Sequence, residues 1–294
     1  MLKRPAVAIA AGFLSVLGYV HAGESTGCTT AQTQCSGYAQ VNGLRMYYEI
    51  HGSGAPFVLI HGGGSTIQTS FGRVLPEFAK THQVIAMELQ AHGHTGDRDD
   101  PETFSQDADD VNELLRQLGV AQADILGFSN GGQTALELAL RHPERVRRLV
   151  LASMFYARDG APAAFWDGMA HAKFSDMPQI YKDAYLKINP DPAALLAMFK
   201  RDSQRMQAFK GWTDAQIRSI QAPAFIVIGD QDLVLPEHAL KMSRLMPHAR
   251  LAIMPGIHGG YLGEAMTPDT GSKQPECFAA MVDEFLAAPA AQGN

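Results

Sequence analysis

The sequence GFSNGG at residues 127–132 decides how this chain of 294 residues is interpreted. It ends a short apolar run that begins at Ile125, and it precedes the helical stretch from Gln133 to Arg141. A serine between glycines at such a point fits the G-x-S-x-G pattern, in which a tight strand-to-helix turn leaves no room for neighbouring side chains. The pattern predicts that the Ser129 hydroxyl is exposed at a strand end, where the helix N-terminus favours developing negative charge.

Short apolar runs alternate with helical patterns on both sides of this segment. Because they lack the polar alternation of half-exposed strands, they are typical of strands buried on both faces, as in a parallel sheet. The runs are Phe57–Ile60, Val84–Met87, Ile125–Gly127, Leu149–Leu151, Phe225–Ile228 and Leu251–Met254. A hairpin pattern from Tyr38 to Ile50, which turns at Asn42-Gly43, precedes them. The order predicts an α/β fold with a mostly parallel, doubly wound sheet and a ligand site at the carboxyl ends of its strands.

The N-terminal segment predicts export. Lys3-Arg4 precedes an apolar run from about Ala6 to Val20, and the small residue Ala22 follows. This is the pattern of a signal peptide, and the run is shorter than the roughly 20 apolar residues of a membrane span. We therefore expect a secreted or periplasmic protein with no membrane span after cleavage. In an oxidising compartment, Cys28 and Cys35 would either form a short-loop disulfide or remain free thiols.

The remaining sequence divides into a core, an insertion and two flanking segments. The insertion has no convincing strand but many aromatic and Met side chains, so it predicts a helical cap over the sheet. The expected divisions are a signal peptide (1–22), a linker (23–36), the core (37–153 and 223–287), the cap (154–222) and a tail (288–294). The formal net charge is −6, and no cluster of Lys or Arg forms a basic stripe, which argues against a nucleic-acid partner.

The loop His61-Gly62-Gly63-Gly64 directly follows an early strand. Serine acyl transfer needs two backbone N–H donors for the oxyanion, one from the residue after the nucleophile and one from such a loop. We expect Asn130 to supply the first donor and Gly63 the second, with Gly64 as the alternative. His61 is expected to brace the loop. A glycine turn without chemical meaning is the competing interpretation.

A serine nucleophile also needs a histidine base and a carboxylate that fixes the histidine tautomer. Gly229-Asp230-Gln231-Asp232 follows one late strand, and Asp232 is preferred to Asp230 because Asp230 lies closer to the strand end. The loop after the final strand, residues 255–260, carries the single histidine His258. The order serine, acid, histidine matches the order expected for this strand-to-helix arrangement.

Residues 38–286 resemble the α/β-hydrolase fold superfamily, in particular its small serine esterases and lactonases. The resemblance is carried by HGGG (61–64), GFSNGG (127–132), RHPERV (141–146), GDQD (229–232) and PGIHGG (255–260). It implies hydrolysis of a small ester or lactone through an acyl-enzyme on Ser129, without a metal or an organic cofactor. Amide, peptide or thioester cleavage, perhydrolysis, and a non-catalytic protein that binds a small ligand are the alternatives.

Two further features concern the substrate and metals. The cap residues predict a small apolar pocket, although most of them are expected to form the core of the cap itself. The candidate pocket residues are Phe128, Tyr156, Phe165, Trp166 and Met169. His92 and His94, followed by Asp97, suggest a metal site, but a turn of the superfamily is expected there and no metal is predicted.

Overall fold

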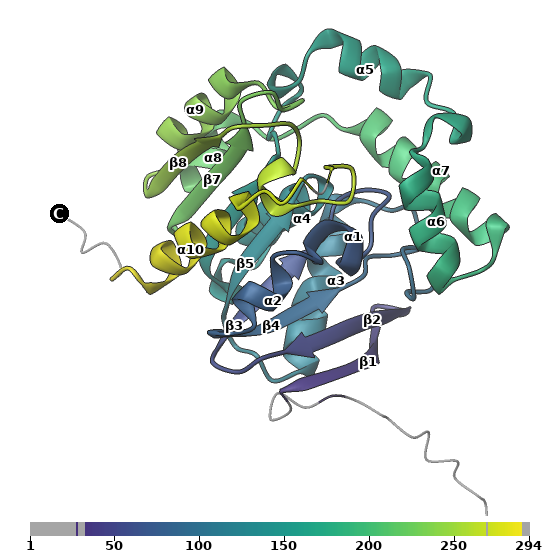
Figure 1. The fold of residues 1–294 in the computed structure, drawn as a ribbon, viewed down its shortest axis with the longest axis horizontal. Helices are drawn as coiled ribbons and strands as arrows, with labels where there is room; N and C mark the ends of the chain where they lie inside the picture. The colour runs from purple at the N-terminus through teal and green to yellow at the C-terminus, as the bar shows by residue number, and fades with distance from the viewer. Residues whose placement is uncertain (1–27, 29–32, 269, 290–294) are drawn as a thin grey trace, which may run out of the picture.

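The fold is built around an eight-stranded sheet (Figure 1). The computed structural model describes residue 28, residues 33–268 and residues 270–289. The strand order of the sheet is β1-β2-β4-β3-β5-β6-β7-β8. The strands are β1 (Gln34–Val41), β2 (Leu44–His51), β3 (Ala55–Ile60), β4 (His82–Met87), β5 (Ala123–Phe128), β6 (Val146–Ala152), β7 (Ala224–Gly229) and β8 (Ala249–Met254). The β1–β2 and β2–β4 pairs are antiparallel and the other pairs are parallel, so the predicted fold class is confirmed.

Helices cover both faces of the sheet. One face packs against α1 (Ile67–Phe71), α2 (Leu75–Phe78) and α10 (Gln274–Ala287). The other packs against α3 (Phe104–Gln117), α4 (Asn130–Arg141), α8 (Asp214–Ser219) and α9 (Pro236–Leu245). Successive side chains of one strand enter different cores: Val58 and Ile60 lie in one, and Phe57 and Leu59 in the other. This explains the apolar runs without polar alternation.

The segment between β6 and β7 is helical. It contains α5 (Ala163–Ala170), α6 (Gln179–Ile188) and α7 (Pro192–Ala208), which lie above the carboxyl ends of the strands in Figure 1. The last helix of the segment, α8, packs instead against α9 in the core layer. The described residues also contain the 3₁₀ turns η1 (Pro143–Arg145), η2 (Arg158–Gly160), η3 (Phe174–Asp176) and η4 (Gly260–Leu262). Within the described ranges, no helix is both long and apolar enough to span a membrane.

Two details of the sheet differ from the sequence-based predictions. Residues 34–36, predicted as the end of the linker, pair with β2. Of the two states expected for Cys28 and Cys35, the structure has the disulfide. The final strand β8 was expected to be buried on both faces, but it forms the sheet edge and Ile253 is 47% exposed. A run of apolar letters does not distinguish an edge strand from a central one. The signal peptide, and residues 290–294 of the tail, lie outside the described residues.

The close approach of α4 to the sheet gives the first prediction. A Cβ atom on Gly131 would lie 2.1 Å from the Ile60 carbonyl oxygen, so Gly131→Ala must displace backbone. We expect it to lower the free energy of unfolding by about 2 kcal/mol or more. Gly96→Ala is the matched control, since its Cβ would meet nothing closer than 4.0 Å. Denaturant titration checks this, and equal stabilities of the two variants would contradict it.

Candidate active site

The turn between β5 and α4 holds Ser129 in an unusual backbone conformation, with φ of 51° and ψ of −122°. A positive φ is strained in a residue other than glycine and costs about 1–3 kcal/mol. The flanking glycines allow the turn, because a Cβ on Gly127 would lie 2.1 Å from the carbonyl oxygen of Gly131. Ser129 is partly exposed, although the strand before it is buried. The turn therefore presents the hydroxyl above the sheet.

The loops after β5, β7 and β8 bring Ser129, Asp232 and His258 together. His258 Nε2 lies 3.0 Å from Ser129 Oγ, and His258 Nδ1 lies 2.7 Å from Asp232 Oδ1. Since an ionised carboxylate can only accept, the proton of the neutral imidazole is on Nδ1 and Nε2 faces the hydroxyl. This arrangement can take a proton from Ser129 and stabilise the resulting imidazolium.

Asp232 is held as an anion inside the protein. Its side chain has no exposed surface, and it accepts hydrogen bonds from Ser153 Oγ (2.5 Å) and from the N–H groups of Val234 (3.1 Å) and Gly229 (3.2 Å). Burial alone would raise the pKa of Asp232, but attraction to His258 in its protonated form and the hydrogen bonds from His258, Ser153 and Val234 lower it below its usual value. Asp230 instead is exposed and accepts the Gly256 N–H at 2.7 Å.

Ser153, which was not predicted as a site residue, contacts Asp232 as well. Besides its bond to Asp232, its hydroxyl lies 2.9 Å from the hydroxyl of Tyr261, which itself donates to the Val227 carbonyl at 2.8 Å. Ser153 has a φ of 49° directly after β6. The only available signal was its position after a buried strand at the same sheet edge.

The glycine loop lies opposite the turn. The His61 imidazole bridges the loop to the segment after β4: its Nδ1 lies 2.7 Å from the Gly62 carbonyl, and Leu89 N–H donates to its Nε2 at 3.0 Å. Burial, together with the nearby charge of His92, lowers the pKa of His61 to about 3, so the ring is neutral and braces the loop. Gly63 and Asn130 both line the cavity. Among the described residues, neither of their backbone N–H groups has a hydrogen-bond acceptor.

Gly64, the alternative donor, is already engaged. Its N–H donates to Asp202 Oδ2 at 2.5 Å, and Asp202 comes from the cap helix α7. The geometry therefore leaves Gly63, rather than Gly64, free to pair with Asn130 as a donor to a ligand oxygen.

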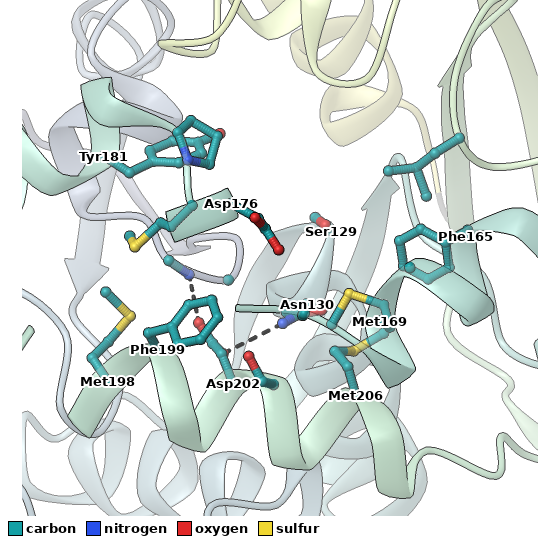
Figure 2. A pocket seen from close by; sticks show the side chains of 18 of the residues that line it. Ser129, Asn130, Phe165, Met169, Asp176, Tyr181, Met198, Phe199, Asp202 and Met206 are labelled. Atoms are coloured by element: carbon teal, nitrogen blue, oxygen red, sulfur yellow. Dashed lines mark hydrogen bonds between the residues drawn. The ribbon is translucent and has the colours of Figure 1, made fainter. Parts of the chain in front are cut away.

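A cavity of about 470 Å³ opens above Ser129, between the sheet and the cap (Figure 2). Its apolar wall consists of Phe155, Phe165, Met169, Met177, Met198, Phe199, Met206 and Leu233. Lys173 is the one basic side chain among the described residues that line it, and Lys173 is exposed. Such a space suits a small, neutral and mainly apolar ligand.

Of the five predicted pocket residues, Phe165 and Met169 line the cavity, whereas the other three do not. Phe128 packs against the His258 ring at 5.0 Å between centroids. Tyr156 is buried and donates to Asp214 at 2.7 Å. Trp166 packs against Phe155 and donates to the Arg158 carbonyl at 2.8 Å. Periodicity alone does not show which cap aromatics face the sheet.

Charged side chains lie buried beside the cavity. His92 Nε2 lies 3.1 Å from Asp202 Oδ2, and His92 Nδ1 lies 2.8 Å from the Gln90 carbonyl. Because both partners are acceptors, both ring nitrogens must carry protons, and the ring is an imidazolium. Burial alone would lower the pKa of His92, but the charge and hydrogen bond of Asp202 raise it to about 9. Arg205 on α7 also pairs with Asp202.

The suggested metal ligands have other partners. His92 contacts Asp202, and His94 Nδ1 lies 2.9 Å from Glu88 Oε2. Asp97 pairs with Arg201 of the cap at 2.7 Å. In the described ranges, no three His, Cys, Asp or Glu side chains are grouped so that they would hold a metal ion.

The sheet order, the turn at Ser129 and the helical cap are those of the α/β-hydrolase fold, and comparisons with known proteins agree with this fold. Residues 55–197 match the family model described as alpha/beta hydrolase fold. The chain is 28% identical over 268 residues to 2-hydroxymuconate semialdehyde hydrolase of Pseudomonas sp. (strain CF600), a match that covers 83% of this chain and 91% of that protein. It is 29% identical over 252 residues to pimeloyl-[acyl-carrier protein] methyl ester esterase of Neisseria meningitidis serogroup B (78% and 91%).

The structure also superposes on the crystal structure of the enol-lactonase from Burkholderia xenovorans LB400. The TM-score is 0.67 at 23% identity, and the match covers 85% of this chain and 100% of that chain. At this identity the likeness concerns the fold alone. The chain has the α/β-hydrolase fold, and the relatives named here are a hydrolase, an esterase and a lactonase.

The His92–Asp202 pair makes stability depend on pH. The pKa of His92 is raised from 6.5 to about 9, so the folded state binds the proton more tightly than the unfolded chain. The contribution of His92 is complete below about pH 6.5 and is lost as the pH rises through about 9, by up to about 3 kcal/mol. Over this range the unfolding free energy of the wild type should therefore fall more steeply than that of His92→Gln. If denaturant titrations gave the same pH dependence of the unfolding free energy for both proteins, the ion pair would be contradicted.

Proposed function

We propose that the protein is a serine hydrolase that cleaves carboxylic ester or lactone bonds through an acyl-enzyme intermediate. The observation that carries the proposal is the arrangement of Ser129, His258 and Asp232, with contacts of 3.0 and 2.7 Å, in which Ser129 lines an apolar cavity. The relative named as a methyl ester esterase supports ester chemistry at the level of the superfamily.

The reaction proceeds in two similar halves. Ser129 Oγ attacks the acyl carbon while His258 Nε2 takes its proton, and Asp232 holds the imidazolium through Nδ1–H. The N–H groups of Gly63 and Asn130 donate to the oxyanion of the tetrahedral intermediate. His258 then returns the proton to the departing alkoxide. Water attacks the acyl-enzyme with His258 again as base, which releases the acid and regenerates Ser129.

The cavity favours neutral substrates of small to medium size. Its wall is built mainly from Phe and Met side chains, and flexible Met residues adapt to different acyl chains. An anionic acyl group would find no buried cation in the described cavity wall, since Lys173 is exposed. Amide, peptide and thioester cleavage and perhydrolysis would use the same three residues, and a substrate panel separates them from ester hydrolysis.

We also propose that the chain is exported through the signal peptide at residues 1–22. The pattern of that segment supports a secreted or periplasmic location, and the Cys28–Cys35 disulfide is in keeping with an oxidising compartment.

Covalent labelling tests the nucleophile. A fluorophosphonate probe should label the wild type and Ser219→Ala, which lacks an exposed serine on α8, but not Ser129→Ala. Ser129→Ala should also lose kcat on a p-nitrophenyl ester by about 10⁶-fold, with residual turnover from the remaining site. Mass spectrometry locates the adduct. Equal labelling of wild type and Ser129→Ala would refute a serine nucleophile at this position.

The two neighbouring carboxylates should differ sharply in activity assays. Asp232→Ala removes the partner of His258 Nδ1, and kcat should fall by about 10⁴-fold because the tautomer is no longer fixed. Asp230→Ala removes an exposed side chain that contacts only the loop backbone, and kcat should change by less than about threefold. Steady-state kinetics on one ester decides between them. A larger loss in Asp230→Ala would reverse the assignment.

A further inference from the structure

The cap helix α7 places a buried carboxylate on the glycine loop of the core. Asp202 Oδ2 accepts the Gly64 N–H at 2.5 Å, and Asp202 Oδ1 lies 3.5 Å from Asn130 Nδ2 (Figure 2). Gly63 precedes Gly64, and Asn130 follows the serine. One side chain of the cap therefore contacts both segments that carry the proposed oxyanion donors.

The glycine loop needs such a contact. Three consecutive glycines have the largest conformational freedom of any tripeptide, and Gly64 adopts a φ of +66°. His61 fixes the loop at its beginning, through the Gly62 carbonyl. The Gly64 N–H beyond it is fixed by Asp202 alone among the described residues. Ser65 adds longer bonds, from its N–H to the Gly62 carbonyl at 3.3 Å and from its hydroxyl to the Gly63 carbonyl at 3.4 Å. Without the Asp202 bond, the peptide between Gly63 and Gly64 is held only by the long Ser65 contact among the described residues, so the loop that carries the Gly63 N–H is less firmly fixed.

Asp202 is itself held firmly. His92 Nε2 lies 3.1 Å from Oδ2, and Arg205 pairs with Oδ1. Arg205 in turn pairs with Glu102 at 2.7 Å and with Asp107 on α3 at 2.6 Å. A carboxylate beside a developing oxyanion would oppose catalysis by charge repulsion, but the cationic His92 and Arg205 balance its charge.

We propose that Asp202 is a positioning residue of the oxyanion hole: it fixes the glycine loop from the cap, so that the hole is complete only when the cap is docked on the core. This inference rests on the proposed serine hydrolase activity. It makes Asp202 part of the reaction without any contact with the reacting atoms.

If Asp202 only docked the cap, its substitution would lower stability without lowering kcat. Arg201 on the same helix α7 provides the control for this distinction. Arg201, next to Asp202, also docks the cap on the core. Its guanidinium pairs with Asp97 at 2.7 Å and donates to the carbonyls of Asp100, at 2.9 Å, and Arg98. Arg201 makes no contact with residues 61–64 among the hydrogen bonds of the described chain. Arg201→Ala therefore removes one contact between the cap and the core, while Asp202 keeps its bonds to Gly64 and His92 and the cap stays docked over the glycine loop.

The kinetic test compares wild type, Asp202→Ala, Asp202→Asn and Arg201→Ala on a short p-nitrophenyl ester. We expect Asp202→Ala to lose kcat by about 100-fold with KM within about threefold of wild type, because a misplaced donor acts on the transition state. Asp202→Asn should lose less, since its amide oxygen can still accept from Gly64. Arg201→Ala should retain kcat while its unfolding temperature falls.

Two further measurements separate positioning from stability. Inhibition by an alkyl trifluoromethyl ketone, whose adduct on Ser129 carries an oxyanion, should weaken in Asp202→Ala by the same factor as kcat/KM. Amide hydrogen exchange of the segment 61–66 should accelerate in Asp202→Ala but not in Arg201→Ala. The exchange result does not require activity, so it tests the contact even if the protein hydrolyses no ester and the proposed function fails.

Three outcomes overturn the inference: wild-type kcat in folded Asp202→Ala, an effect on KM alone, or an equal loss of kcat in Arg201→Ala. Unchanged hydrogen exchange at 61–66 in Asp202→Ala also overturns it. If Asp202→Ala does not fold, Asp202→Leu, whose side chain fills the same space but accepts no hydrogen bond from Gly64, is compared by the same criteria. Turnover by the wild type and its absence in Ser129→Ala show in the same assay whether the proposed function holds.

Discussion

The close contact between the start of α4 and the sheet is the constraint on which the rest of the site depends. The turn at Ser129 is possible only because Gly127 and Gly131 approach to a distance that no Cβ allows. The positive φ of Ser129 is a local cost of about 1–3 kcal/mol. Packing of α4 against β3, β5 and β6 offsets that cost and fixes the direction of the hydroxyl.

Parallel strand order then determines which other residues can reach Ser129. Strands β5, β6 and β7 are neighbours in the sheet and end at the same edge, followed by β8. Ser153 and Asp232 follow β6 and β7, and His258 follows β8, so groups far apart in sequence form one chain of hydrogen bonds. Asp232 is anchored by backbone and hydroxyl donors, which makes the acid end of this chain rigid.

The sequence allows prediction of those features that local backbone geometry fixes. The turn at 127–131, the glycine loop and the order of strands each need particular residue types at particular positions, and each is visible without a structure. Ser153 and Asp202 are different, because a serine after a strand or an aspartate on an amphipathic helix is common. Their importance depends on how distant elements dock. The same reason explains why Tyr156 and Trp166, which belong to packed clusters, were mistaken for the cavity wall.

The buried charges beside the cavity follow from the way the cap meets the core. Burial of an isolated carboxylate between the cap and the core would have a large free-energy cost. Removal of one partner from a buried network of charges typically leaves the other charges unpaired. Asp202 therefore stays charged only with His92 and Arg205 in place. These two cations come from different parts of the protein: His92 belongs to the loop after β4 of the core, whereas Arg205 belongs to the cap helix α7. The network is complete only when the cap is closed, so the fold makes a docked cap the electrostatically favoured state and keeps the glycine loop in one conformation.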